Sequence, residues 1–475
     1  MLAKLKQELP LKHIQKLNKN SHLVITRHEA ILMRKKIASC LAMTEKVKNM
    51  SKNVLLSFKG NKQIDTEIKL TGSKSECNRA LIISALSKGS VSVDNLSVAA
   101  DTVTLNKVLN ELREKSLEFE NNSQLATHNS QLVDIGPAGT AMRFLTAYLA
   151  IQNGNFLLTG TERMKQRPIG ILAEAIKSIG GNITYVENDG FPPLQISGPL
   201  KQTSPKVKIK GDISSQYISA LLMIASSLPL GLTLEIEGEL TSKPYVDMTL
   251  AMLEQVGIRN DWNEDTITIE PQSFNSAKLY VEPDWSAASY WYAIAALSDE
   301  ATIFLPGLNG YSLQGDSKIT EIMANFGITS QFKNGGVYLK KEPKKLERKI
   351  FDLKECPDLA QTIVVVCAAL GHDATFTGLE TLKIKETNRV LALQTELAKI
   401  GVKFIEKNLS YKLDCSGLHF PEKITISTYE DHRMAMAFAP LALKINTVEI
   451  EEKQVVEKSY PYFWDDLEKA GFEIG

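Results

Sequence analysis

Cysteine is scarce in this chain of 475 residues, which contains five, and no two of them form a CxxC pair. A disulfide framework is therefore not expected, and a reducing, cytoplasmic location is. Long apolar runs are also absent, since none reaches the roughly 18 residues that a membrane-spanning helix needs. An excess of either charge is missing too, because 55 basic residues balance 55 acidic ones. We therefore expect neither nucleic acid nor a membrane surface as a partner.

Motifs that would indicate a cofactor or a metal are missing as well. GSKS at Gly72 is not a phosphate-binding GxxxxGK[ST] loop, and no GxGxxG follows a predicted strand. HExxH and GxSxG do not occur, and the seven histidines are scattered. We therefore expect no metal and no organic cofactor.

The balance of charge hides a difference between the first fifty residues and the rest. Residues 1–50 carry 11 basic and 3 acidic residues, so the remaining chain has a net charge of −8. We expect residues 1–50 to be a flexible basic extension without catalytic residues. A transit peptide, or an upstream start codon with translation from Met50, are the alternatives.

One pattern recurs six times along the chain: a short polar turn precedes about a dozen mostly apolar residues. The six copies begin at Gly72, Gly136, Gly211, Glu282, Cys356 and Thr428. Successive copies start 64 to 75 residues apart. A helix that is apolar on most faces is a buried helix, and the polar turn can cap its N-terminus. The repeat therefore predicts six buried, capped helices.

A second, amphipathic helix follows the buried helix in each copy. In NRVLALQTELAKIG, for example, Val390, Leu393, Leu397 and Ile400 share one face. Most of these helices are predicted to end at a left-handed glycine. These glycines are Gly180, Gly257, Gly327, Gly401 and Gly471. Short β-branched runs come next, so each copy reads as a βαβαββ unit.

Three units in each half predict an α/β fold of two similar domains with the active site in the cleft between them. We expect a discontinuous domain I of residues 51–71 and 283–475, and a domain II of residues 72–282. Each helix N-terminus carries roughly half a positive charge and free N–H groups. Buried helices that point at the cleft would make it an anion site. The alternative is a set of ordinary capped turns.

The polar turns hold many basic side chains and few acidic ones. The basic residues are Lys74, Arg79, Arg143, Arg163, Lys165, Arg167, Lys383, Lys385, Arg389, Arg433 and Lys458. Cations at the mouths of apolar helices are costly to desolvate unless they pair, and arginine suits phosphate and carboxylate. The pattern therefore predicts substrates with several negative charges. Asp358 and Glu386 are left for proton transfer, and so many cations would keep both ionised.

Eight motifs in one order, over roughly residues 55–470, resemble the 5-enolpyruvylshikimate-3-phosphate (EPSP) synthase family. They are GSKSECNRAL, AGTAMR, RMKQRPIG, SSQYISALLM, SKPYVDMTL, PDLAQT, KIKETNR and DHRMAMAFAPLAL. The resemblance implies two domains, each of three βαβαββ units. It also implies a shikimate-pathway enzyme that transfers the carboxyvinyl group of phosphoenolpyruvate to the 5-hydroxyl of shikimate-3-phosphate and releases phosphate. The reaction would pass through a tetrahedral intermediate, in a monomer without a cofactor.

The resemblance also implies residue roles. The catalytic residues would be Asp358 as the base for the hydroxyl, Glu386 as proton donor or acceptor at C3, and Lys74 as the other acid/base candidate. The phosphoenolpyruvate ligands would be Lys74, Gly139, Thr140, Arg167, Gln216, Arg389, Arg433 and Lys458. The shikimate-3-phosphate ligands would be Lys74, Ser75, Arg79, Ser214, Ser215, Gln216, Ser242, Tyr245, Asp358, Thr381 and Lys385. Asp101 and Arg143 would support the site from its edge.

Two positions depart from the family pattern. Pro137 stands where the family usually has asparagine before AGTAMR, which removes an amide side chain and a backbone donor. Thr381 stands where asparagine is common, and its hydroxyl could retain one substrate contact. Neither change affects Asp358, Glu386 or Lys74, so we expect activity.

The sequence argues against two rival functions. The related UDP-N-acetylglucosamine enolpyruvyl transferases typically carry a reactive cysteine in the loop that corresponds to TERMKQRPIG, and this loop has none. They also lack the SSQ triplet present here. A non-catalytic anion-binding relative would be expected to lose Asp358 or Glu386, and both are present.

Overall fold

The computed structural model describes residues 52–121, 130–212 and 214–475. The described residues from Asn53 to Gly475 belong to one compact unit. The basic extension expected over residues 1–50 lies outside the described residues. Within the described ranges, no helix combines the length and the apolarity that crossing a membrane requires.

The first three repeats form the elements between residues 74 and 280. The first has α2 (Lys74–Leu86), β3 (Val91–Asp94), α3 (Ala100–Asn121) and, from later in the chain, β12 (Ala277–Tyr280). The second has β4 (Gln131–Asp134), α4 (Gly139–Ala150), β5 (Gly154–Thr159), η3 (Met164–Gln166), α5 (Gly170–Ser178), β6 (Asn182–Tyr185) and β7 (Leu194–Gly198). The third has β8 (Lys206–Lys210), α6 (Ser215–Ala225), β9 (Leu232–Glu237), α7 (Lys243–Gln255), β10 (Asp261–Asn263) and β11 (Thr266–Ile269).

The last three repeats combine with two strands from near the start of the described chain, β1 (Val54–Ser57) and β2 (Gln63–Glu67). The fourth repeat has α8 (Trp285–Leu297), β13 (Glu300–Pro306), η4 (Gly315–Lys318), α9 (Ile319–Ala324), β14 (Ile328–Lys333) and β15 (Gly336–Lys341). The fifth has β16 (Ile350–Asp352), η5 (Pro357–Leu359), α10 (Ala360–Ala369), β17 (Ala374–Thr377), η6 (Glu380–Ile384), α11 (Arg389–Ala398), β18 (Lys403–Lys407) and β19 (Ser410–Asp414). The sixth has β20 (Lys423–Ile426), α12 (His432–Phe438), η7 (Ala439–Leu443), β21 (Thr447–Ile450), η8 (Lys453–Lys458), α13 (Phe463–Lys469) and β22 (Glu473–Ile474).

Five sheets among the described strands share one strand order. In the second repeat, β4 pairs parallel with β5, whereas β7 pairs antiparallel with both β5 and β6. A parallel pair needs a crossover, and the buried helix supplies it. The fourth sheet gains its parallel strand from β2, and the sixth gains β1. The first repeat forms a smaller sheet of β3 and β12.

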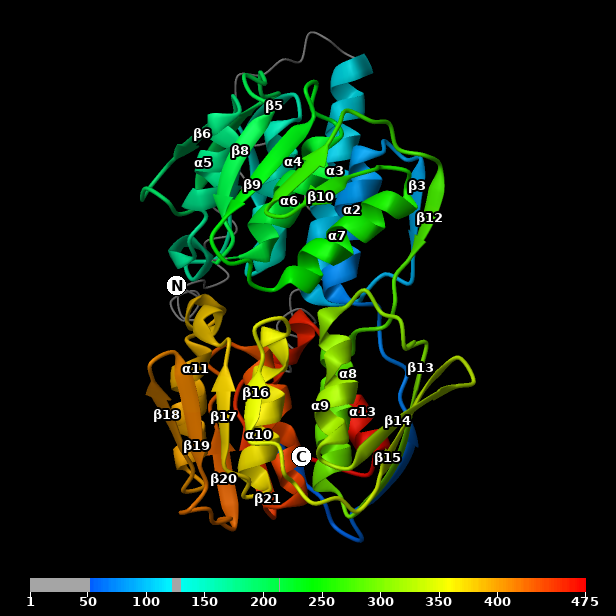
Figure 1. Cartoon of the computed structure of the whole chain (residues 1–475), viewed down its shortest axis with the longest axis vertical. Helices are drawn as coiled ribbons and strands as arrows, with labels where there is room; N and C mark the ends of the chain where they lie inside the picture. The colour runs from blue at the N-terminus through cyan, green and yellow to red at the C-terminus, as the bar shows by residue number, and fades with distance from the viewer. Residues whose placement is uncertain (1–51, 122–129, 213) are drawn as a thin grey trace, which may run out of the picture. The chain divides into compact units, whose positions relative to one another are not determined.

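The described residues form two hydrophobic cores. The central core contains buried residues between Cys77 and Val281, including those of α2, α4 and α6. The flanking core combines residues 54–70 with residues 285–472, including those of α8, α10 and α12. Figure 1 shows these two groups of helices, the first in blue to green and the second in yellow-green to orange. This division supports the predicted boundaries of domains I and II, which stay a prediction.

The six predicted buried helices are α2, α4, α6, α8, α10 and α12, and the expected capping holds for four of them. The side chains of Ser73, Ser214, Asp284 and Asp431 accept hydrogen bonds from the first turns of α2, α6, α8 and α12. Within the described part of the chain, no side chain caps α4, whose N-cap is Ala138, or α10, which follows the 3₁₀ turn η5. Helix α12 is also shorter than predicted, because Pro440 lies where the chain continues as η7.

The predicted glycine ends are confirmed. Gly180, Gly257, Gly327, Gly401 and Gly471 all have φ between 74° and 104°. Left-handed backbone is easily adopted only by glycine, so these residues release the chain from each amphipathic helix into the next strand.

Candidate active site

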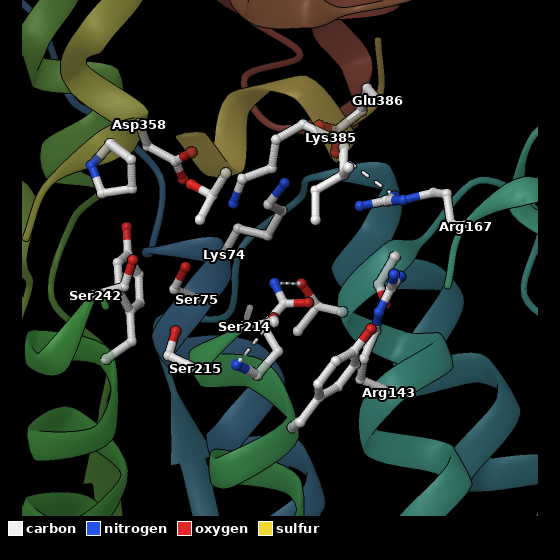
Figure 2. Close-up of a pocket in the computed structure, with 18 of the residues that line it drawn as sticks. Lys74, Ser75, Arg143, Arg167, Ser214, Ser215, Ser242, Asp358, Lys385 and Glu386 are labelled. Carbon is white, nitrogen blue, oxygen red and sulfur yellow. Dashed lines mark hydrogen bonds and ion pairs between the residues drawn. The ribbon is translucent and has the colours of Figure 1, made fainter. Parts of the chain in front are cut away.

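One pocket brings together residues from five of the six repeats (Figure 2). Every predicted site residue except Lys458 lines it. These are Lys74, Ser75, Arg79, Asp101, Gly139, Thr140, Arg143, Arg167, Ser214, Ser215, Gln216, Ser242, Tyr245, Asp358, Thr381, Lys385, Glu386, Arg389 and Arg433. Lys458 contacts a member of this set, since its Nζ lies 3.2 Å from Glu386 Oε1. The fourth repeat supplies no lining residue.

Asp358 lies in η5 and is held by two arginines. Arg433 Nη2 donates to its Oδ2 at 2.7 Å, and Arg389 Nη1 donates to its Oδ1 at 3.1 Å. Burial raises the pKa of Asp358, but Arg433, Lys385 and Arg389 outweigh that effect and hold the pKa below its usual value. The carboxyl group is therefore ionised and can accept a proton.

Glu386 lies three residues before the start of α11 and contacts three cations. Arg389 Nη2 donates to its Oε2 at 2.9 Å, and Lys458 Nζ and Arg167 Nη1 lie 3.2 Å and 3.9 Å from its Oε1. Burial alone would raise the pKa of Glu386, but Lys458, Arg389 and Arg167 bring it well below its ordinary value. Glu386 is thus a second ionised carboxylate, as the sequence predicted.

Arg389 is the buried link between these carboxylates. It is 1% exposed, and its Nε donates to Asp431 Oδ2 at 2.7 Å. Asp431 also caps α12 through Arg433 N. Burial lowers the pKa of Arg389, but its three carboxylate partners raise it further, so the guanidinium stays charged. Most of its donors are committed within the protein, which fixes the relative positions of Asp358 and Glu386.

Two other arginines in the pocket form no ion pair with any described carboxylate. Arg79 donates to Thr249 Oγ1, Ser219 Oγ and the Tyr245 carbonyl from a site that is 1% exposed. Arg143 donates to the carbonyls of Gly139 and Pro168. Burial lowers the pKa of Arg79 and of Arg143 to about 10, so each stays charged near neutral pH. Uncompensated buried cations favour an anionic ligand.

The start of α4 lies against Arg167. A Cβ atom on Gly139 would lie 2.4 Å from Arg167 Nη1, so any larger residue would displace this guanidinium. Among the described residues no side chain caps α4, so its first N–H groups keep no side-chain partner, and Gly139, Thr140 and Arg167 all line the pocket. Gln216 Nε2 donates to Thr140 Oγ1 at 3.2 Å, which ties α6 to this turn.

Lys74 begins α2 and is held by two acids. Its Nζ lies 3.3 Å from Asp101 Oδ2, and its backbone N donates to Asp284 Oδ2 at 3.2 Å. Figure 2 shows Lys74 extending toward Lys385 and Asp358, with Ser75, Ser214 and Ser215 below it. Lys74 therefore lies between the serines and the acid-bearing turns.

Ser242 has left-handed backbone at the N-cap of α7, with φ of 56°. A residue other than glycine rarely adopts this conformation, and such strain is found at functional sites. Its backbone N donates to the Lys354 carbonyl at 3.3 Å, a contact between the third and fifth repeats. Ser242 and Tyr245 both line the pocket.

Comparisons with known proteins identify the family of the chain that contains this pocket. Residues 58–467 match the family model for EPSP synthase (3-phosphoshikimate 1-carboxyvinyltransferase). The chain belongs to the EPSP synthase family. The 3-phosphoshikimate 1-carboxyvinyltransferase of Bacteroides fragilis is 48% identical over 415 residues, covering 87% of this chain and 97% of that protein. The enzyme of the same name from Shewanella sp. (strain ANA-3) is 34% identical over 417 residues, covering 85% and 96%.

Solved structures agree at the level of fold. An EPSP synthase structure from Acinetobacter baumannii superposes with a TM-score of 0.67 at 18% identity, covering 89% of this chain and all of that one. The predicted fold is confirmed. Membership in the EPSP synthase family also confirms the prediction of a transferase of the shikimate pathway, and the rival assignment to the UDP-N-acetylglucosamine family is not supported.

The pocket of this EPSP synthase family member also contains a histidine, His432, to which the sequence analysis assigned no role. His432 follows Asp431 at the start of α12, is 1% exposed and lines the pocket. Neither ring nitrogen has a hydrogen-bond partner among the described residues. Burial, Lys74 and Arg433 lower the pKa of His432 well below its usual value, so the ring is neutral. It can donate one hydrogen bond and accept another.

Other lining residues were not predicted either. They are Pro168, Tyr217, Thr241, Pro357 and Ile384. Each lies within three residues of a predicted one, so the family motifs could have indicated them. Arg163 is outside the lining set, but its Nε donates to the Glu386 carbonyl at 3.0 Å. This bond joins the RMKQRPIG loop to the KIKETNR turn.

Proposed function

We propose that this chain transfers the carboxyvinyl group of phosphoenolpyruvate to the 5-hydroxyl of shikimate-3-phosphate, giving 5-enolpyruvylshikimate-3-phosphate and phosphate. The observation that carries the proposal is the pocket itself. It combines a dense set of cations with two ionised carboxylates, Asp358 and Glu386. Two phosphates and one carboxylate need such cations, and each proton transfer needs a group that changes charge.

The two ends of the pocket suit different substrates. Arg167, Arg389 and Lys458 contact Glu386, and Arg433 contacts Asp358, which shares Arg389 with Glu386. Because Arg167 also lies against the start of α4, we assign phosphoenolpyruvate to this end together with Gly139 and Thr140. We assign shikimate-3-phosphate to the end that holds the serines, with its predicted ligands, of which Lys74 and Gln216 are predicted to contact phosphoenolpyruvate as well. These ligands are Lys74, Ser75, Arg79, Ser214, Ser215, Gln216, Ser242, Tyr245, Asp358, Thr381 and Lys385.

The charges assign the proton transfers. Ionised Asp358 accepts the proton of the 5-hydroxyl as its oxygen attacks C2 of phosphoenolpyruvate. Ionised Glu386 has no proton to give at that moment, so Lys74 protonates C3. In the second stage, Glu386 accepts a C3 proton while the C2–O bond to phosphate breaks. Of the two protons then held by Asp358 and Glu386, one leaves with the phosphate and one returns to Lys74. Preorganised cations stabilise the negative charge of the tetrahedral intermediate.

The two cores support two domains, with domain I formed by residues 51–71 and 283–475 and domain II by residues 72–282. We propose that the substrates bind between them, which would orient the reacting groups and exclude water. We also propose that the chain acts as a monomer in the cytoplasm.

The direct test measures phosphate release from phosphoenolpyruvate by the purified full chain. Release should require shikimate-3-phosphate, and UDP-N-acetylglucosamine should not replace it. No release with shikimate-3-phosphate, or release with the sugar nucleotide instead, would contradict the proposed function.

Variants test the carboxylates. Asp358→Ala and Glu386→Gln should each lower kcat by about 100-fold or more, since positioned acid–base groups contribute about 10² to 10⁴ in rate. Substrate binding, measured by calorimetry, should persist. Glu380→Gln is the matched control, because Glu380 is exposed in η6 near the same turn. A kcat within threefold of the control in either variant would refute that residue's role.

A further inference from the structure

A buried carboxylate lies behind Arg433, outside the pocket. Arg433 Nη2, which donates to Asp358 Oδ2 at 2.7 Å, also lies 3.3 Å from Ser286 Oγ and donates to it. The Ser286 hydroxyl in turn donates to Asp316 Oδ2. Neither Ser286 in α8 nor Asp316 in η4 lines the pocket. One guanidinium nitrogen therefore connects Asp358 with the pair of Ser286 and Asp316.

Asp316 is poorly compensated. It is 2% exposed, and its Oδ1 has no hydrogen-bond partner among the described residues. It forms no ion pair within the ranges that the structure describes. The nearby positive charge is Arg433, to which Asp316 is connected by way of the Ser286 hydroxyl. A buried carboxylate with so few partners costs folding free energy, so a structural role alone explains it poorly.

We propose that Asp316, acting through Ser286, is a positioning residue that sets how far Arg433 neutralises Asp358. This inference rests on the proposed role of Asp358 as the base for the hydroxyl. When Asp316 is ionised, it shares the charge of Arg433 and adds negative potential beside Asp358. Both effects make Asp358 a stronger base.

The groups around Asp316 bring its pKa close to neutral pH, so that its charge changes within the pH range of an activity assay. Burial and the charge of Asp358 raise the pKa of Asp316 to about 7, although Arg433 and the Ser286 hydrogen bond oppose them. The titratable or charged groups that face it are Asp358, Arg433, Asp284, Tyr245 and Cys356. Burial raises the pKa values of Tyr245 and Cys356, so both are neutral near pH 7. Asp316 therefore gains its negative charge as the pH rises through about 7, and kcat should rise with it.

The test is the pH profile of kcat for phosphate release between pH 5.5 and 9. Asp316→Asn keeps an oxygen that can accept the Ser286 hydrogen bond but removes the charge. This variant should lose the inflection near pH 7 and have a lower kcat at pH 8, on the order of tenfold, because a neighbouring charge moves a pKa by about one unit or more. Ser286→Ala removes the hydrogen bond that lowers the pKa of Asp316, so its inflection should move to higher pH.

Asp466→Asn is the matched control. Asp466 is also 2% exposed, belongs to the flanking-core segment and accepts a hydrogen bond from the Tyr460 hydroxyl at 2.8 Å. It should retain the wild-type profile even if its melting temperature falls. An Asp316→Asn profile that matches the control overturns the inference. If Asp316→Asn fails to fold, an unshifted inflection in Ser286→Ala overturns it.

The inference and the proposed function fail in different ways. Absence of phosphate release from the wild-type chain overturns the proposed function and this inference with it. Release by the wild-type chain, with profiles that neither substitution changes, overturns the inference alone.

Discussion

Gly139 offers a sharp test of how the phosphoenolpyruvate end of the pocket is built. In Gly139→Ala the new Cβ would lie 2.4 Å from Arg167 Nη1 and 2.9 Å from its Cζ, whereas ordinary contact begins at 3.4 Å. The Arg167 guanidinium must therefore move by about 1 Å, because the start of α4 is fixed by the helix. Arg167 is 7% exposed and lies beside Glu386, so it has little free space for this movement.

The magnitude follows from the contact that is displaced. A hydrogen bond to a charged group contributes about 1.5 to 3 kcal/mol. Its loss corresponds to roughly a 10- to 150-fold change at about 1.4 kcal/mol per factor of ten. We expect the KM for phosphoenolpyruvate to rise by this factor, while the KM for shikimate-3-phosphate changes by less than about threefold. The substitution should not weaken α4 itself, because alanine stabilises a helix by about 1 kcal/mol relative to glycine. We therefore expect no loss of thermal stability from the helix.

Steady-state phosphate release with each substrate varied in turn measures both constants. Gly310→Ala is the control, because its Cβ would meet only the Phe332 ring at an ordinary 3.5 Å, outside the pocket. An unchanged KM for phosphoenolpyruvate in Gly139→Ala would refute the placement of Arg167 at this substrate. Equal rises for both substrates would show that the variant disturbs the whole pocket instead.

Two further predictions concern contacts outside the proposed chemistry. Arg163→Ala should lower kcat by about two- to tenfold, because it removes the hydrogen bond to the Glu386 carbonyl. Lys165→Ala in the same loop is the control and should leave kcat unchanged. Equal kcat values in the two variants would contradict a role for the Arg163 hydrogen bond. Burial raises the pKa of Glu76 from 4.5 to about 8, so the folded state binds more protons and stability falls as the pH rises between these values. Glu76→Gln should therefore stabilise the protein more at pH 8.5 than at pH 5, with a difference in the free energy of unfolding of at most roughly 5 kcal/mol at about 1.4 kcal/mol per pKa unit. Thermal denaturation at the two pH values should show this as a larger rise in melting temperature at pH 8.5. A gain that is equal at both pH values would count against this buried, protonated carboxyl group.

Much of the pocket could be predicted from the sequence because its residues sit at equivalent points of a repeat. Lys74, Thr140 and Ser214 each lie within a few residues of the start of a buried helix. When such helices pack parallel to one another, their N-termini lie close together at one end. Sequence reasoning missed His432 for a physical reason. Whether a histidine has a hydrogen-bond partner depends on what surrounds it, and here α12 places both ring nitrogens without a described partner.

The capping prediction shows the same limit. The sequence indicates a polar turn before each helix, but backbone geometry decides whether a side chain reaches the first N–H groups. At α4 and α10 no described side chain does so. The sequence also did not indicate that the fourth repeat supplies Ser286 behind Arg433 rather than a lining residue.

The sequence by itself determined the repeat, the helix ends and the family, because hydrophobic periodicity, glycine positions and motif order are local properties of the chain. Only the tertiary structure decided which charges share partners. Arg389 joins Asp358, Glu386 and Asp431, and Arg433 joins Asp358 to Ser286. Charge sharing depends on distances between segments far apart in the chain and on burial, and neither can be read from residue order.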